Sequence, residues 1–180
     1  MGMCGRSHGL SWVSVLVALA LWALLAAWAW PAWQAWLARQ RLERVATILQ
    51  TDLALARSAA LLRHRAVTLC PSVDRQRCTP TTDWSSGWLI FVDGNRDGRR
   101  QEDEAILRVQ NEAARPHRLR FVATDGRYVL YLPNGRAYLA SGAFQAGAWL
   151  ICVHGHPDGE RLVLNAVGRV RREWAPNACV

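Results

Sequence analysis

The segment Gly168-Arg169-Val170-Arg171-Arg172, close to the C-terminus, carries residue types that bind anions. If this segment is a strand, Arg169 and Arg171 lie on one face while Val170 points into the core. Their two guanidinium groups are then about 7 Å apart, which roughly matches successive phosphates on one strand of DNA. Arginine forks bind phosphate well, and Arg172 adds a supporting charge. The alternative is an edge strand whose charged, wet face prevents unwanted pairing of sheets.

The overall charge fits an anionic partner without identifying it. The chain has 22 arginines, no lysine and 14 acidic residues, which gives a formal net charge of +8. A basic domain attracts nucleic acid, lipid headgroups or acidic polymers, but the same excess also serves solubility alone. Binding to double-stranded DNA through such arginines would depend on phosphates and would weaken strongly with salt. Further arginines would widen the basic surface if folding brings them near: Arg118, Arg120, Arg136 and Arg161.

A second group of residues matches the spacing of a calcium-binding loop. The segment from Asp93 to Gly98, followed by Glu104, fits the EF-hand pattern D-x-[DN]-x-[DN]-G-x5-E. The loop follows an expected strand rather than a helix, and arginines within it add positive charge. The alternative is a hairpin loop whose Asp and Asn side chains cap its own backbone. If calcium binds, which is the one cofactor that the sequence indicates, its oxygen ligands come from Asp93, Asn95, Asp97 and Glu104.

The cysteines predict disulfides. Four of the five cysteines lie beyond the N-terminal apolar segment: Cys70, Cys78, Cys152 and Cys179. An even number in a domain outside the reducing cytoplasm indicates two disulfides, for which the sequence allows three pairings. We favour Cys70 with Cys78, which closes a short loop, and Cys152 with Cys179, which ties down the C-terminus. The Cys-x-x-Cys spacing of zinc sites does not occur.

The sequence does not indicate an enzyme. It contains no G-x-S-x-G, no H-E-x-x-H and no phosphate-binding glycine loop, and no convincing acid–base pair is evident. The acidic run Glu102-Asp103-Glu104 is typical of a solvated loop. We therefore expect a structural or binding protein.

The chain that positions these residues begins with an export or membrane segment. No charged residue occurs between Leu10 and Ala38, and a short polar leader precedes this run. About 20 apolar residues suffice to cross a bilayer as a helix. One interpretation is a secretory signal that is cleaved near Ala29. We favour the other, a cut after Gly9 that leaves the apolar segment as an anchor, because the helical pattern continues past Ala29.

Helical periodicity extends beyond the anchor to about Arg63. Charged residues, including Asp52, are expected mostly outside the buried stripe. Apolar residues recur in steps of three and four at Leu42, Val45, Leu49, Leu53, Ala56 and Ala60. The expected organisation is a leader at residues 1–9, a transmembrane segment at 10–38, an amphipathic continuation of the helix at 39–65 and a β-rich domain at 66–180.

The β-rich domain is expected to hold short strands separated by turn signals such as Asn134-Gly135. The fold class is α+β, with one long N-terminal helix packed on an antiparallel sheet. Tryptophans at 84, 88 and 149 are expected in the core. The expected strands are Ala66–Leu69, Gly87–Val92, Ala105–Val109, Leu119–Ala123, Tyr128–Leu132, Trp149–Val153, Leu162–Asn165 and Arg169–Trp174.

An ordered set of short segments spans nearly the whole chain. It starts with a leader ending in Gly9, an apolar helix that begins at Leu10, and Pro31 within that helix. It continues with Val67-Thr68-Leu69-Cys70-Pro71-Ser72, Ser86-Gly87-Trp88-Leu89-Ile90-Phe91-Val92-Asp93, Leu132-Pro133-Asn134-Gly135-Arg136 and Val167-Gly168-Arg169-Val170-Arg171. This set resembles the type IV pilin-like proteins and, among them, the minor pseudopilins of the GspH/FimT type.

The resemblance implies a processed membrane protein that assembles with other pilins or pseudopilins. A prepilin peptidase would cut between Gly9 and Leu10 at the inner membrane, and methylation of the new N-terminus would follow. The single-pass helix would then hold the domain in the periplasm until it enters a pilus or pseudopilus. Family members usually have a glutamate where this chain has Ser14, which favours a rare position in a filament over that of a bulk subunit.

The resemblance also bears on DNA. Some FimT-like members are implicated in DNA uptake during natural transformation through a Gly-Arg-x-Arg segment, which corresponds here to Gly168, Arg169 and Arg171. The resemblance therefore implies a minor pilin of a type IV pilus that contacts double-stranded DNA. The alternative is a minor pseudopilin of a type II secretion system, which has no need of DNA.

Overall fold

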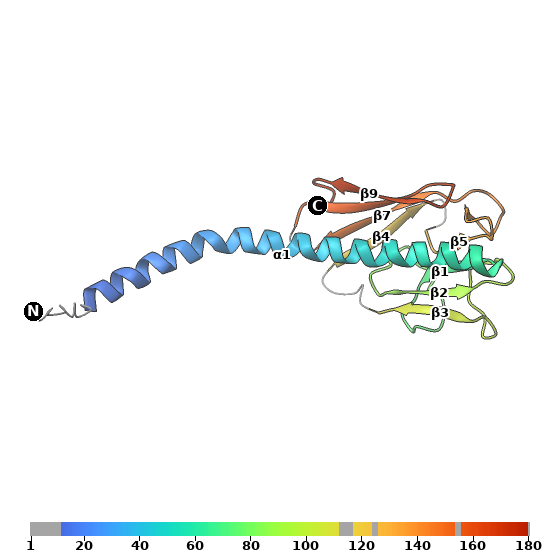
Figure 1. The fold of residues 1–180 in the computed structure, drawn as a ribbon, viewed down its shortest axis with the longest axis horizontal. Helices are drawn as coiled ribbons and strands as arrows, with labels where there is room; N and C mark the ends of the chain where they lie inside the picture. The colour runs from blue at the N-terminus through green and yellow to red at the C-terminus, as the bar shows by residue number, and fades with distance from the viewer. Residues whose placement is uncertain (1–11, 112–116, 124–125, 154–155, 180) are drawn as a thin grey trace, which may run out of the picture. The chain divides into compact units, whose positions relative to one another are not determined.

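The computed structural model describes residues 12–111, 117–123, 126–153 and 156–179. The helix α1 (Trp12–Arg63) comes first, and nine strands follow within the described residues (Figure 1). The chain divides between Leu37 and Ala38 into two compact units. The fold is therefore a long N-terminal helix followed by a β-rich region, as the sequence predicted.

The first unit contains the apolar N-terminal part of α1. Its large side chains are exposed, among them Trp22, Trp28 and Trp30. The rings of Trp33 and Trp36 lie 5.2 Å apart between centroids. This part of α1 is long and apolar enough to cross a membrane.

The strands form two antiparallel sheets rather than the single sheet expected from the sequence. One sheet has the order β3-β2-β1-β5-β6 and the other the order β4-β7-β8-β9. The first consists of β1 (Val67–Pro71), β2 (Trp88–Val92), β3 (Ile106–Gln110), β5 (Val129–Tyr131) and β6 (Ala137–Tyr138). The second consists of β4 (His117–Ala123), β7 (Gly147–Val153), β8 (Gly159–Leu164) and β9 (Val170–Ala175).

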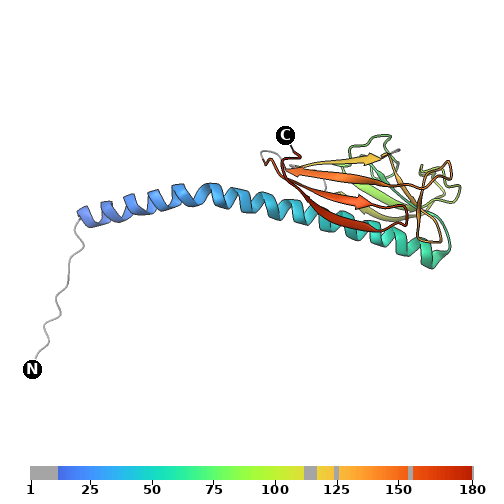
Figure 2. The same cartoon turned by 90° about the horizontal axis from the view of Figure 1, so that it is seen from above.

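The main hydrophobic core lies where α1, from Ala38 onward, packs on both sheets (Figure 2). The predicted stripe on α1 is confirmed, because each of its six apolar residues is buried. The first sheet contributes Leu69 and Trp88 to this core, and the second contributes Trp149 and Leu162. The prediction that Trp84, Trp88 and Trp149 lie in the core is likewise confirmed. Burial of side chains of this size is the main source of stability in such a domain.

A smaller cluster covers the other face of the five-stranded sheet. It consists of Ala66, Cys70, Leu89, Phe91, Tyr128 and Leu130. Cys78 packs against the cluster. Strands β1 and β2 are consequently buried along their whole length, since both faces of the sheet are covered.

The expectation that Asp52 lies outside the buried stripe is wrong. Asp52 is fully buried, and its Oδ2 accepts a hydrogen bond of 2.8 Å from Nε1 of Trp88. Its Oδ1 lies 3.1 Å from Nε of Arg108 on β3. The buried surface of the helix is therefore wider than the apolar stripe, because β2 and β3 of the five-stranded sheet supply polar partners that let this carboxylate be buried.

Candidate nucleic-acid interface

The turn between β8 and β9 begins the Gly-Arg-Val-Arg-Arg segment. Asn165 and Arg169 close the turn, because Asn165 N–H donates to the carbonyl of Arg169 at 3.0 Å. Gly168 has a φ of +77°, and a Cβ at this position would lie only 2.3 Å from the carbonyl oxygen of Gly135. A glycine is therefore required here by the backbone and by the contact between two turns, whatever the segment binds.

Arg57 on α1 holds these two turns together. Its Nε donates to the carbonyl oxygen of Gly135 at 2.8 Å, and its Nη2 donates to that of Val167 at 3.2 Å. The helix thereby positions the turn that carries Arg169. Sequence reasoning missed Arg57, although an arginine between the buried residues Ala56 and Ala60 of a helix is a signal for such a contact.

A hollow of about 380 Å³ lies beside this turn and is lined by α1, Tyr131 and Arg169. Tyr131 is fully buried, and its hydroxyl has no hydrogen-bond partner in the part of the chain that the structure describes. Burial raises the pKa of Tyr131, against the effect of the nearby Arg57, so the phenol stays neutral. The cationic side chains at this hollow are Arg57 and Arg169.

The three arginines of the segment have different environments. Arg169 is exposed at the turn, and no ion pair of its guanidinium group occurs within the described residues. Arg171 is exposed on β9, with its Nη2 2.8 Å from Oε1 of Glu173. Such an exposed ion pair contributes little to stability, so a phosphate can replace the carboxylate at low cost. Arg169 and Arg171 are consequently accessible to an anion.

Arg172 is not available in the same way. Its Nη2 donates to Oγ1 of Thr47 at 2.6 Å and to the carbonyl of Glu43 at 3.3 Å, so it joins β9 to α1. Its Nε also lies 3.2 Å from Oε1 of Glu160, which is buried. Burial raises the pKa of Glu160, Arg172 opposes this rise, and Glu43 adds to it. The structure therefore gives Arg172 a role in packing rather than the role of supporting charge that the sequence suggested.

The other arginines proposed for a wider basic surface are only partly brought together. Arg120, Leu150, Arg161 and Glu173 are successive register partners across β4, β7, β8 and β9. Arg118, the register partner of Cys152, lies two residues earlier on β4, and the side chains of this strand are outside the described residues. The row that contains Arg161 lies two positions from that of Arg171, whose partner on β8 is Val163, and the row of Arg118 lies two positions further away.

Arg136, in contrast, lies at the Leu132–Arg136 turn and not on these rows. Its guanidinium carbon is 5.8 Å from the ring centroid of Phe144. Among the side chains that the structure describes, Arg161 therefore lies on the same sheet as Arg171, and Arg136 does not.

The loop with calcium-type spacing uses its oxygens to bind its own backbone. Asp93 is fully buried, and its carboxylate accepts hydrogen bonds from the backbone N–H groups of Arg96 and Gly98 and from the hydroxyl of Thr68. Glu104 accepts from the N–H groups of Gly94 and Gln101 in the same way. Among the described residues, no group of three or more His, Cys, Asp or Glu is placed to hold a metal ion. The arrangement fits the self-capped loop rather than a calcium site.

We expect that calcium does not stabilise this protein. Full-length protein in an uncharged detergent should have the same thermal midpoint with excess calcium and with a chelator, because a ligand stabilises only the state that binds it. Thermal unfolding followed by near-UV circular dichroism measures this midpoint. A rise of several degrees with calcium, lost in an Asp97→Asn variant, would contradict this interpretation.

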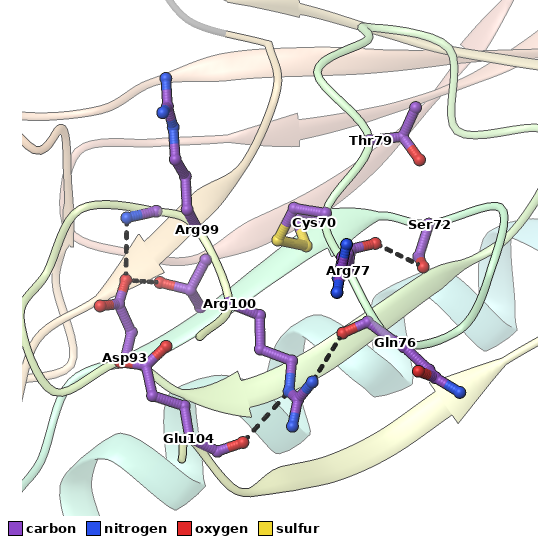
Figure 3. The surroundings of a disulfide bond; sticks show 12 residues. Cys70, Ser72, Gln76, Arg77, Thr79, Asp93, Arg99, Arg100 and Glu104 are labelled. Atoms are coloured by element: carbon purple, nitrogen blue, oxygen red, sulfur yellow. Dashed lines mark hydrogen bonds between the residues drawn. A yellow bond between two sulfur atoms is a disulfide. The ribbon is translucent and has the colours of Figure 1, made fainter. Parts of the chain in front are cut away.

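Two disulfides hold the loops of the domain. Cys70 on β1 pairs with Cys78, and Cys152 on β7 pairs with Cys179, each with a Cα–Cα distance of 5.5 Å. These are the pairs favoured from the sequence. Figure 3 shows the first disulfide next to Arg100, which reaches between Glu104 and Gln76.

The fold and the arrangement of its loops define a pilin-like protein. The profile of the family described as "Type II transport protein GspH" matches residues 46–168. The chain belongs to this family, the GspH/FimT type of minor pilins and pseudopilins.

Solved structures show the same fold. The chain is similar to the type IV minor pilin FimU of Pseudomonas aeruginosa, with 24% identity over 79% of this chain and 97% of that one and a TM-score of 0.58. A second crystal form of FimU gives 22% identity over 77% and 100%, with a TM-score of 0.55. The minor pseudopilin EpsH of the Vibrio cholerae type 2 secretion system gives 14% identity over 74% and 97%, with a TM-score of 0.50. No curated protein matches the chain. Both the family and these relatives consist of structural subunits rather than enzymes.

Proposed function

We propose that this protein is a minor pilin of a type IV pilus, made as a precursor and held in the inner membrane before assembly. A prepilin peptidase removes residues 1–9 by cutting between Gly9 and Leu10. Residues 10–38 form the anchor, and the β-rich domain from residue 66 lies in the periplasm. The observation that carries this proposal is the uncharged, exposed apolar part of α1 placed directly before a GspH-type domain.

The physical properties of the anchor suit a filament. A helix rich in Ala and Leu can exchange lipid for similar helices at little cost, so the membrane serves as a reservoir for assembly. Ser14 cannot neutralise the N-terminal ammonium group of a neighbouring subunit as a glutamate would. We therefore assign the protein to a rare position, at the tip or in initiation, where few such contacts are made.

The domain also binds double-stranded DNA in this proposal. Arg169 and Arg171 are both exposed, and their one ion pair within the described residues is the weak surface contact between Arg171 and Glu173. The turn that carries Arg169 is fixed by Gly168 and Arg57, which lowers the entropy lost on binding. Contacts of this type recognise phosphates rather than bases, so little sequence preference is expected.

The DNA-binding proposal predicts a large loss of affinity in the double variant Arg169→Gln/Arg171→Gln. We expect affinity for a short DNA duplex to fall about tenfold, and the slope of log K against log salt to fall by about 2, because two phosphate contacts are lost. Fluorescence anisotropy with the full chain in uncharged detergent measures both quantities. The control Arg41→Gln/Arg63→Gln removes the same charge from exposed positions on α1. Equal losses in both variants would exclude a specific role for Arg169 and Arg171.

The second candidate is a minor pseudopilin of a type II secretion system. The observation that favours it is the description of the matching family as a type II transport protein. Deletion of the gene separates the two functions in the native host. Loss of pili or of transformation supports the first candidate, and accumulation of exported proteins in the periplasm supports the second.

A further inference from the structure

A second basic site lies far along the chain from the Gly168–Arg172 segment. A hollow of about 480 Å³ opens between the loop closed by Cys70 and Cys78 and the loop from Asp93 to Glu104. Four separate segments of the chain line it: these two loops, Arg127 and Tyr128 directly before β5, and Ala140 after β6. Its size is in the range of hollows that hold small ligands.

Four arginines converge on this hollow: Arg77, Arg99, Arg100 and Arg127. The acidic residue in its lining is Asp97, whose carboxylate already accepts hydrogen bonds from Arg99 N–H at 2.8 Å and Gln101 Nε2 at 2.9 Å. Arg77 lies 3.4 Å from Oε1 of Glu102, but both side chains are largely exposed and the pair is weak. The lining therefore contains more arginines than carboxylates, and Arg77 and Arg99 are exposed in it.

The hollow is rigid because one of its arginines fastens the two loops. Arg100 donates from Nε to the carbonyl of Glu104 at 3.1 Å and from Nη1 to that of Gln76 at 2.9 Å (Figure 3). Its Nη2 also donates to the carbonyl of Glu102 at 3.2 Å. The disulfide fixes the other end of the Gln76 loop. Arg99 is exposed and points away from these contacts in Figure 3, and no hydrogen bond or ion pair of its guanidinium group occurs among the described residues.

Gly98 sets the floor of the hollow. It has a φ of +73°, and a Cβ there would lie 2.8 Å from the ring of Tyr128. Because Gly98 can pass so close to the ring of Tyr128, the chain turns there and places Asp97, Arg99 and Arg100 along the edge of the hollow. Buried capping of Asp93 and Glu104 holds the same loop from the inside.

We propose that this hollow binds a multiply charged anion of the phosphate class, with Arg77 and Arg99 as its main contacts and Arg100 as a positioning residue. Guanidinium groups repel one another when they gather, and a fixed arrangement of several of them is matched best by an anion that accepts hydrogen bonds on several oxygens. A single carboxylate would neutralise only part of the charge. The site is separate from Arg169 and Arg171 and does not depend on the DNA-binding proposal.

The test is a titration of the full-length protein in uncharged detergent with pyrophosphate at low salt, measured by isothermal calorimetry. We expect saturable binding that weakens about tenfold or more in Arg77→Gln/Arg99→Gln and weakens with added salt. The control Arg41→Gln/Arg161→Gln removes the same charge from exposed positions outside the hollow. No binding by the wild type, or equal losses in the two double variants, would overturn the proposal. Should the double variant lose its near-UV circular dichroism, Arg99→Gln alone replaces it, since this side chain makes no contact that folding needs.

A second arm of the experiment separates two sources of the phosphate group. A short DNA duplex is added to the protein saturated with pyrophosphate. If the duplex displaces pyrophosphate from the wild type, the site binds phosphodiesters of nucleic acid, and if it does not, the site is specific for a small phosphorylated ligand. Both results support the phosphate chemistry of the hollow.

Discussion

Replacement of Asp52 by alanine is expected to lower the free energy of unfolding by about 2–3 kcal/mol. The carboxylate of Asp52 is fully buried and accepts the hydrogen bond of Trp88 Nε1 at 2.8 Å. Alanine leaves this buried indole N–H without a partner, and it also removes the ion pair with Arg108. The half-exposed side chain of Arg108 can be solvated after the substitution. The unpaired indole N–H of Trp88 therefore accounts for most of the lost stability.

The matched control is Asp52→Asn, which keeps an oxygen that can accept the bond from Trp88. Burial raises the pKa of Asp52, although Trp88 and Arg108 act in the opposite direction. The charged form is therefore disfavoured in the fold, and the neutral amide should remain within about 1 kcal/mol of the wild type. Guanidinium-induced unfolding of the full chain in detergent, followed by near-UV circular dichroism, gives these differences.

The same carboxylate predicts how stability depends on pH. Because its folded-state pKa is raised, the folded state holds the proton more tightly than the unfolded state does. Stability therefore falls as pH rises from the ordinary aspartate value through the raised one, and Asp52→Asn should reduce this fall. The pKa of Glu160 is raised as well, so part of this fall in stability remains in the Asp52→Asn variant. Equal stability of the alanine and asparagine variants at pH 7 would contradict the role assigned to the Trp88 bond.

Removal of the disulfide between Cys152 and Cys179 is expected to have the largest effect on stability, about 3–4 kcal/mol. The two cysteines are 27 residues apart, so the bond restricts a long loop in the unfolded chain. The bond between Cys70 and Cys78 spans only 8 residues and should contribute about 2–3 kcal/mol by the same reasoning. Denaturant midpoints of Cys152→Ala/Cys179→Ala and of Cys70→Ala/Cys78→Ala measure these losses.

Hydrogen bonds also hold the C-terminus, and they suggest the result that would contradict this prediction. Cys179 N–H donates to the carbonyl of Pro157 at 3.0 Å, and Asn177 N–H donates to Oδ1 of Asp158 at 3.0 Å. If these bonds sufficed, Cys152→Ala/Cys179→Ala would unfold at the same midpoint as the wild type. In that case the disulfide would have no part in fixing the C-terminus.

The fold was predictable from the sequence where local periodicity decides it. The stripe from Leu42 to Ala60 and the buried tryptophans follow from helical spacing and side-chain size. The division into two sheets was not predictable, because β1 pairs with β2 and also with β5, which lies about sixty residues further along the chain. Strand β6 was missed because two residues give no alternation to detect. Asp52 was misplaced because its partners Trp88 and Arg108 lie on β2 and β3, far along the chain from the helix, and leave no local pattern.

The candidate site was predictable only at the level of residue type. Alternation along β9 correctly separates Arg171 from Val170, but the bonds from Arg172 to Thr47 cross from the C-terminus to the helix and leave no local pattern. The same is true of the bonds from Arg57 to Gly135 and Val167 and of the bond from Arg100 to Gln76, whose acceptors are distant backbone carbonyls. The calcium-type spacing identified a real loop, yet the spacing cannot show that Asp93 and Glu104 already bind backbone N–H groups.

The central claim, that this GspH-family chain is a processed and membrane-retained pilin, is tested most directly at its N-terminus. Full-length protein is produced with and without a prepilin peptidase, purified from membranes, and examined by intact mass and N-terminal sequencing. We predict that the product made with the peptidase begins at Leu10 and retains the apolar segment, whereas the product made without it begins at Met1. A mature protein that begins near Trp30, or one that the peptidase leaves uncut, would contradict the account.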